Sequence, residues 1–423
     1  MIPCENQSRA ASRPRGIQNV YERTASPAAD ARRVLALCWT AYAASYLSRS
    51  NMAVSLARIV GENGYPVSAV SVLGTLFFVF YAVGQLVNGR VGDFAPPRAM
   101  IFFGMFLSGL CNMLFGWTRA YWALAVAWAV NGYALSALWG PMMRLMAHYY
   151  DEARRNAVST IMMTSSAVGC VASWGLAGPV LARFGYQPLF YGTGALTLLY
   201  CLAFLLLLPR ADIRPAARAP RKGGIHAGLA SLVAILLVCA AMGFIKEGIN
   251  FYAPYMMERT GAISVSLAVV LPLFSFAGSL LSGLLNRRAG ISIAGLVSVL
   301  FGACLAALAL LYALGRTGTF AAPLILGMLG IASATMYAVT TYLIGFYPMR
   351  FYGVNAVSYV AGLLDFFTYI GAGASSVLSG ALFDRSGLHS VILVWAVLAA
   401  LVTAAAFAAR AVSGRSASSK AEK

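Results

Sequence analysis

Twelve separate apolar runs divide this chain and limit it to one kind of fold. A bilayer core about 30 Å thick needs about 20 apolar residues per spanning helix, and backbone polar groups in lipid must pair within their own segment. The runs lack the period-2 alternation that builds a β-barrel. The sequence therefore predicts an all-α polytopic membrane protein with twelve transmembrane helices. They start near Val34, Ala69, Ala99, Tyr121, Ala157, Pro188, Ala227, Ile263, Ile291, Phe320, Asn355 and Val391.

The charge of the chain fits a membrane protein better than a nucleic-acid-binding one. Of the 423 residues, 60% are hydrophobic and only 10% are charged, yet the net charge is +18. Most of the 31 Lys and Arg residues fall in the N-terminal tail and in alternate loops, on one side of the predicted membrane. This asymmetry predicts that both termini are cytoplasmic, and it excludes nucleic acid as a partner.

Three pairs of matching stretches indicate that the chain is a duplication. Gly84 and Gly89 match Gly278 and Gly283 at an offset of 194. The Asn-Ala-Val-Ser sequence at 156–159 reappears at 355–358, at an offset of 199. A third register, at 197, aligns Arg49 with Lys246. Parallel repeats of this kind build one large class of secondary transporter.

We therefore expect two pseudo-symmetric six-helix bundles around a central cavity. A stretch from Pro209 to Ile225 holds three prolines and several basic residues, which is typical of a solvated linker. The expected order is a cytoplasmic tail (1–33), the N-terminal bundle (34–208), a cytoplasmic linker (209–226), the C-terminal bundle (227–412) and a cytoplasmic tail (413–423).

Two cations lie within predicted transmembrane helices, at equivalent places in the two halves. Arg49 lies in the apolar run from Val34 to about Ala57, and Lys246 in the run from Leu229 to about Met257. A charge at the centre of a lone helix costs about 2.5 kcal/mol or more, so such residues face a bundle interior and mark a substrate or ion path. Together, Arg49 and Lys246 predict one central anion site.

Polar side chains at helical spacing accompany both cations. Tyr42, Ser45 and Tyr46 lie seven, four and three residues before Arg49, and Asn250 follows Lys246 by four, so each set shares a helix face. A guanidinium binds phosphate through a bidentate fork, and an ammonium adds a point charge. The hydroxyls and the amide suit a phosphorylated polyol.

Two acidic residues are candidates to neutralise Lys246. Glu247 is adjacent in the chain, and Asp365 lies within the eleventh predicted helix. Neighbouring residues on a helix point about 100° apart, so Asp365 is the better partner if the seventh and eleventh helices face each other. We also expect Asp365 to bias the charge of the substrate that the site accepts.

Several of these stretches resemble one family. The chain from about Val34 to Val412 is similar to the organophosphate:phosphate antiporters of the major facilitator superfamily. The resemblance rests on 42–51 (YAASYLSRSN), Tyr81, Trp139-Gly140-Pro141 with Arg144 and His148, and Lys246-Glu247-Gly248-Ile249 with Pro254.

The resemblance implies roles for individual residues. Arg49 corresponds to the helix 1 arginine that grips phosphate in that family, and Lys246 stands where a second arginine is usual. Tyr81 and Trp139 become second-tier substrate contacts, although aromatic residues in a bundle are more often core. In the glycerol-3-phosphate transporter a lysine occupies the position of Gln85, so this chain has lost a potential cation there.

A short charged turn after the second predicted helix resembles the acidic-basic loop of the superfamily. It contains Arg90 and Asp93, and Arg144 lies near the same cytoplasmic face. An acid flanked by arginines can form ion pairs that differ between conformations. We therefore expect Asp93, Arg90 and Arg144 to seal the cytoplasmic end in one state of a rocking transport cycle.

The function expected from these features is secondary transport of a small phosphorylated organic anion, of the sugar phosphate, glycerol phosphate or phosphoglycerate class, in exchange for inorganic phosphate. Two alternatives stay open: a proton- or sodium-coupled carboxylate transporter, and a transport-inactive sensor of the same fold. We expect a monomer in the bacterial cytoplasmic (inner) membrane. With scattered cysteines, no histidine cluster and no P-loop, we expect neither a metal, nor a cofactor, nor an enzyme.

Overall fold

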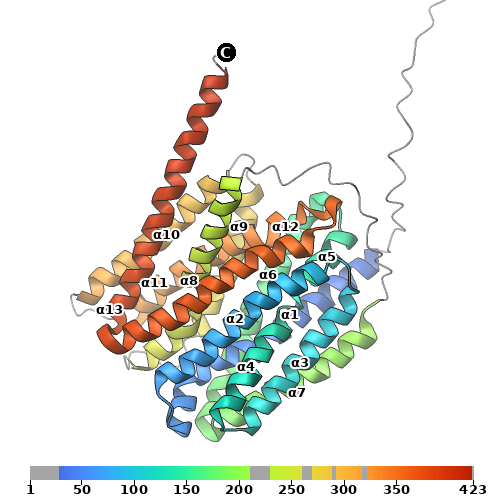
Figure 1. Cartoon of the computed structure of the whole chain (residues 1–423), viewed down its shortest axis with the longest axis vertical. Helices are drawn as coiled ribbons and strands as arrows, with labels where there is room; N and C mark the ends of the chain where they lie inside the picture. Colours follow the sequence, from blue (N-terminus) through green and yellow to red (C-terminus); the bar gives the residue numbers. More distant parts are fainter. Residues whose placement is uncertain (1–27, 210–228, 260–268, 288–291, 317–321, 422–423) are drawn as a thin grey trace, which may run out of the picture.

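The structure, a computed structural model, describes residues 28–209, 229–259, 269–287, 292–316 and 322–421. Helices account for nearly all of this part of the chain (Figure 1). Residues 210–226 of the predicted linker, the N-terminal tail up to residue 27, and the expected starts of the seventh, eighth, ninth and tenth spans lie outside the described residues.

The N-terminal half consists of α1 to α7. Their bounds are α1 Ala28–Asn63, α2 Val67–Val91, α3 Pro97–Trp117, α4 Tyr121–Leu135, α5 Trp139–Tyr149, α6 Glu152–Phe184 and α7 Tyr186–Leu207. Together, α4 and α5 form one broken span, and Asp151 caps α6 by accepting the backbone N–H of Arg154. This half therefore supplies six spans.

The C-terminal half repeats that arrangement. Its elements are α8 Leu229–Arg259, α9 Val270–Arg287, α10 Ile293–Arg316, α11 Ala322–Thr340, the π-helix η2 Thr341–Phe346, α12 Tyr347–Met349, the 3₁₀ turn η3 Tyr352–Val354 and α13 Val357–Ala421. The last of these bends at Gly387, whose φ of 72° suits glycine, so α13 contains two spans, Val357–Phe383 and Arg385–Arg410. Six spans again result.

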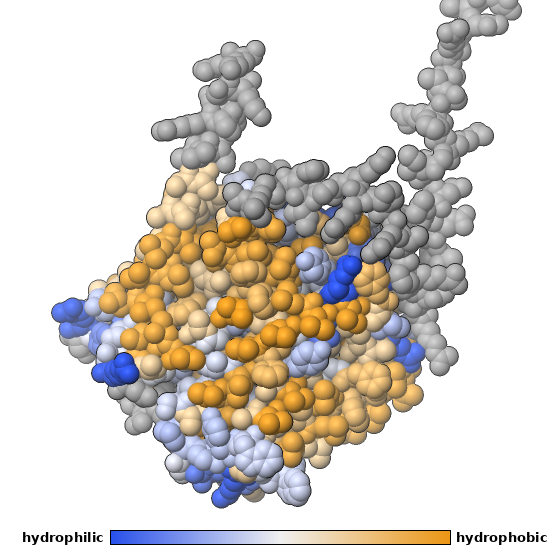
Figure 2. Space-filling model, in the orientation of Figure 1, coloured by the Kyte–Doolittle hydropathy of each residue, from blue (hydrophilic) through white to orange (hydrophobic). Residues whose placement is uncertain are grey.

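The described helices account for twelve spans. Ten described helices are long and apolar enough to cross a bilayer, α9 adds a shorter apolar helix, and α1 is the charged span that carries Arg49. Hydrophobic residues cover most of the face in Figure 2, and hydrophilic residues gather toward its ends. The predicted all-α, twelve-helix fold is confirmed.

The glycine repeats of the sequence correspond to equivalent packing in the two halves. A Cβ at Gly84 would meet Ser136 after α4, and one at Gly278 would meet the Ala334 carbonyl of α11, so α2 and α9, the second spans of the two halves, each pack on the fourth span of their own half. The contacts of α1 with α6 are likewise repeated by α8 with the first span of α13. The two bundles are related as the matching registers predict.

Candidate functional site

Arg49 lies where the two bundles meet. It projects from α1 toward α2, α8 and α13, and its Nη1 donates a 3.1 Å hydrogen bond to the hydroxyl of Tyr369 on α13. The guanidinium carbon lies 4.9–5.4 Å from four ring centroids, those of Tyr46, Phe77, Tyr81 and Tyr369. Aromatic faces attract a cation without neutralising it. Among the described residues, Arg49 has no ion pair.

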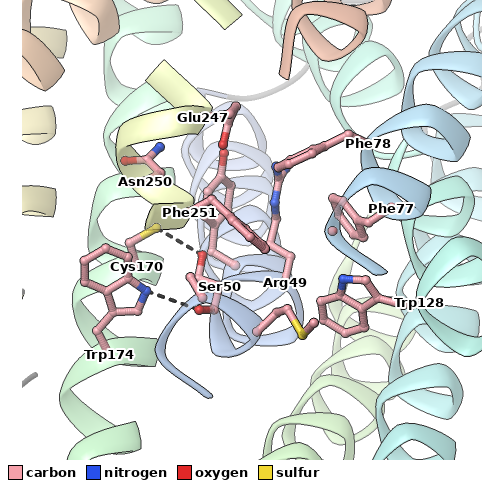
Figure 3. Close-up of a pocket in the computed structure, with 14 residues that line it drawn as sticks. Arg49, Ser50, Phe77, Phe78, Trp128, Cys170, Trp174, Glu247, Asn250 and Phe251 are labelled. Atoms are coloured by element: carbon pink, nitrogen blue, oxygen red, sulfur yellow. Dashed lines mark hydrogen bonds between the residues drawn. The ribbon is translucent and has the colours of Figure 1, made fainter. Parts of the chain in front are cut away.

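A small cavity lies beside Arg49. It has a volume of about 50 Å³, and aromatic side chains from α2, α4, α6 and α8 form most of its wall (Figure 3). Its polar lining groups are Arg49, Ser50, Glu247 and Asn250. Ligand pockets usually measure about 300–1,000 Å³, so this cavity would have to widen to hold a sugar phosphate.

The structure corrects the expectation about Lys246. Its Nζ lies 3.0 Å from Oε1 of Glu247, and both side chains are more than nine-tenths buried. The argument from helix angles failed because both side chains are long enough to turn toward each other, and no water competes for either charge. Glu247, rather than Asp365, is therefore the ion-pair partner of Lys246. Arg49 is left as the cation without an ion-pair partner among these residues, as expected if either acid neutralises Lys246.

The predicted candidates separate into two groups in space. Arg49, Tyr46 and Asn250 line the cavity, and Asn250 donates a 3.1 Å hydrogen bond to the hydroxyl of Tyr337. Lys246 stands just behind it, paired with the cavity residue Glu247, and lies 5.2 Å from the ring of Tyr337.

The other candidates lie away from that cavity. Tyr42 packs on Tyr46 and Trp139, and Ser45 donates its hydrogen bond to the Tyr42 carbonyl of its own helix. Trp139 donates a hydrogen bond to the Ile344 carbonyl of η2, and this bond joins the two bundles. Tyr42, Ser45, Tyr81, Trp139 and Asp365 do not line the cavity in this conformation.

Sequence reasoning missed several residues of the site. Tyr369 is the hydrogen-bond partner of Arg49, and Phe77, Phe78, Trp128 and Trp174 provide the aromatic wall. A signal for some of them was available: Tyr369 follows Asp365 by four residues, and Phe77 precedes Tyr81 by four, so each shares a helix face with a predicted candidate. Nothing in the spacing indicated the two tryptophans.

Contacts between the bundles close the end of the molecule where α2 meets α13. The carboxylate of Asp93 accepts backbone N–H groups of Ser358 and Tyr359, at 3.0 and 3.2 Å, and the Asn355 amide donates to the Asp93 carbonyl at 3.3 Å. We call this cluster the Asp93 seal. Positive-inside topology predicts that it faces the cytoplasm.

The seal differs from the ion pairs expected at this end. Arg144 donates to the backbone carbonyls of Gly92 and Ala95, at 2.9 and 3.1 Å, and no Asp93–Arg144 ion pair is present in the described part of the chain. Arg90 is exposed and lies 4.8 Å from the ring of Phe94. Burial raises the pKa of Asp93 to about 6, although the two N–H groups and Arg144 act in the opposite direction.

Glycines let the two bundles approach closely beside the seal. A Cβ built at Gly362 on α13 would lie 2.2 Å from the Gln85 carbonyl oxygen on α2 and 3.0 Å from the Gly89 Cα. Tyr252 and Ser376 both donate hydrogen bonds to Ser71 at 3.3 Å, and these contacts lie on the other side of Arg49 from the Asp93 seal. The two bundles are therefore in contact on both sides of Arg49.

Comparison with known proteins places this architecture. The family model described as Major Facilitator Superfamily matches residues 38–359. A probable hexose phosphate transport protein of Chlamydia pneumoniae is 23% identical over 176 residues, which are 42% of this chain and 38% of that protein. The membrane sensor protein UhpC of Escherichia coli (strain K12) is 29% identical over 140 residues, 33% of this chain and 31% of UhpC.

Two human proteins extend the comparison. Sugar phosphate exchanger 3 is 33% identical over 129 residues, 29% of this chain and 26% of the exchanger. These three relatives are each matched over less than two-fifths of their own length. The organic anion transporter MFSD10 (TETRAN) shares the fold, with a TM-score of 0.65 over 88% of this chain and 98% of its own, at 14% identity.

These relatives confirm the resemblance to the organophosphate:phosphate antiporter group. The matched family model, together with the fold of twelve helices in two repeated bundles, shows that the chain belongs to the Major Facilitator Superfamily.

Proposed function

We propose that this protein carries a small phosphorylated organic anion across a bacterial cytoplasmic membrane by alternating access, in exchange for inorganic phosphate. The observation that supports this most is the guanidinium of Arg49, which faces the inter-bundle cavity with one tyrosine hydroxyl as its hydrogen-bond partner and no carboxylate among the described residues. A phosphate or carboxylate can occupy the remaining donors as a bidentate acceptor.

The surroundings of Arg49 favour a ligand with a polar head and a less polar body. The head would lie at Arg49 and Asn250, and Phe77, Phe78 and Trp128 would contact the carbon skeleton. Aromatic rings bury apolar faces of a ligand and leave few donors for hydroxyl groups. The names of the matched relatives, which include hexose phosphate and sugar phosphate proteins, support the phosphorylated class.

Movement of the bundles would supply the alternating access. The cavity of about 50 Å³ is too small for a sugar phosphate, and contacts between the bundles lie on both sides of it. Opening either end needs only those contacts to break, while each bundle keeps its own packing. Both bundles belong to one chain, so a monomer suffices.

The Lys246–Glu247 ion pair changes the electrostatic argument for exchange, because it alters the charge of the empty site. With Lys246 neutralised, the empty site holds one uncompensated cation, Arg49, and closing a low-dielectric cavity around it still costs free energy. An anion that replaces the lost hydration lets the bundles close and reopen on the far side. We therefore retain exchange, with one cation as its physical basis.

Counterflow into proteoliposomes tests the proposal. Vesicles loaded with inorganic phosphate and empty vesicles would receive labelled glucose 6-phosphate, glycerol 3-phosphate or phosphate, at matched membrane potential. We expect fast uptake of at least one of these only into loaded vesicles. Equal initial rates in both would show free return of the empty carrier and would refute exchange.

The sensor reading has one observation in its favour, the 29% identity to a protein named as a membrane sensor. The same assay separates the two functions. A sensor would bind an organophosphate, as a shift of thermal unfolding would report, and would show no uptake into either set of vesicles. Succinate uptake that needs no phosphate inside would favour the carboxylate alternative.

A further inference from the structure

Asp365 is a buried acid that the proposed anion site does not use. It lies on α13, only 5% exposed, and one helical turn before Tyr369, the partner of Arg49. In the described part of the chain it makes neither a hydrogen bond nor an ion pair. Of the two cations that act on it, Arg49 and Lys246, the second is already paired with Glu247.

The charged and titratable groups that act electrostatically on Asp365 come from α1, α2 and α8: Arg49, Tyr42, Tyr81, Lys246, Glu247 and Cys239. Arg49 and Lys246 attract its negative charge, and Glu247 repels it. The four charged side chains Arg49, Lys246, Glu247 and an ionised Asp365 sum to zero.

An ionised carboxylate at this place is expensive. Asp365 is 5% exposed and has no hydrogen-bond donor among the described residues, and removing a charge from water without a partner costs far more than burying the neutral acid. Protonation removes that cost and leaves the site with a net charge of +1. A bound monoanion then brings the sum back to zero.

We propose that Asp365 carries a proton whenever the Asp93 seal is closed, and loses it when that end opens. The step is one proton transfer. Before the Asp93 end closes, the carboxylate takes H⁺ from the water that reaches it. The new O–H bond persists while that end is closed, and it breaks when that end opens and water reaches Asp365 again. No other bond changes. The inference rests on the proposed anion transport, because the proton and a monoanion together make the closed site neutral.

The proposal limits the form in which a ligand crosses. A dianion in the closed site would leave an uncompensated negative charge, whereas a phosphate monoester carrying one proton of its own is balanced by Arg49. In an exchange cycle the proton would accompany the anion in both directions. Exchange of two monoanions would then move no net proton.

Infrared spectroscopy of the full-length protein in bilayers tests this without a ligand. At pH 7.5 the wild-type protein should show the carbonyl stretch of one protonated carboxylic acid that Asp365→Asn lacks. Glu152→Gln, which removes an exposed acid at the start of α6, is the control, and that variant should keep the band. Asp365→Glu should restore the band if Asp365→Asn folds poorly.

A second variant tests the dependence on conformation. Gly362→Ala places a Cβ against the Gln85 carbonyl across the bundle interface and should open the Asp93 end. We expect the Asp365 band to fall at least fivefold in that variant at pH 7.5. Loss of only ionised carboxylate bands in Asp365→Asn, or a full band in an opened Gly362→Ala, would overturn the proposal. Failure of organophosphate transport would leave both spectra unchanged.

Discussion

Replacing Gly362 by alanine should shift the protein away from the conformation described here, toward one that is open at the Asp93 end. Gly362 on α13 and Gln85 on α2 belong to different bundles, and the new Cβ would lie 2.2 Å from the Gln85 carbonyl oxygen. Backbone atoms cannot rotate away as a flexible side chain can. In the open state the two helices separate there, and the clash disappears.

The size of the effect follows from this difference between the two states. Overpacking a well-packed interface costs about 1–3 kcal/mol, and here the cost applies to the closed state alone. A free-energy difference of that size lowers the ratio of closed to open protein about 5- to 150-fold. The population should therefore move visibly even if the wild-type protein is mostly closed.

A pair of spin labels would measure the shift. Ala153 at the start of α6 and Val354 in η3 are exposed and lie on opposite bundles at this end. We expect a longer label distance in Gly362→Ala than in the wild type. Gly278→Ala is the matched control: its Cβ would lie 2.0 Å from the Ala334 carbonyl within one bundle, so it should lower thermal stability and leave the distance unchanged. An unchanged distance in folded Gly362→Ala would refute the reasoning.

Three further predictions concern the acidic residues. The closed state raises the pKa of Asp93 to about 6, so the contribution of Asp93 to closure is full below the ordinary aspartate pKa near 4 and is lost as the pH rises through about 6. The label distance should lengthen over that range, and Asp93→Asn should lose this part of the pH response. Glu247→Gln leaves Lys246 buried without its partner, so the free energy of unfolding should fall by about 3–5 kcal/mol. Dianionic ligands should also gain affinity relative to monoanionic ones. A stability equal to that of the wild type would refute the role of the pair. Asp365→Asn is uncharged, like the protonated acid, so competition assays should show an unchanged preference for monoanionic substrates; a shift toward dianions would show that Asp365 is ionised when the ligand binds.

The sequence predicted the fold in detail because membrane helices have a strong local signal. Length and hydropathy decide each span, and the offset of 194 aligned Gly84 with Gly278 because both allow a close helix approach within their bundles. The buried position of Lys246 and the place of Arg49 between bundles followed from the same reasoning, since a charge inside a membrane has few other places to go.

The partners of those charges could not be predicted in the same way. The Lys246–Glu247 contact depends on side-chain torsions, which helix periodicity does not describe. The Asp93 seal uses backbone N–H groups at the start of α13, and backbone donors are invisible in a pattern of residue types. Tyr369 contacts Arg49 across 320 residues of chain, a pairing that only the packing of the two bundles determines.

Replacing Arg49 by lysine, which keeps the positive charge but removes the guanidinium, tests the central claim most directly. The measurement is the affinity of purified Arg49→Lys for the organophosphate that the wild type binds, with Arg58→Lys on the exposed far part of α1 as the control. Lysine cannot form the bidentate fork, and a hydrogen bond to a charged group contributes about 1.5–3 kcal/mol. The account predicts that Arg49→Lys binds about 10- to 150-fold more weakly while Arg58→Lys binds as the wild type does. Equal affinity in Arg49→Lys and the wild type would contradict it.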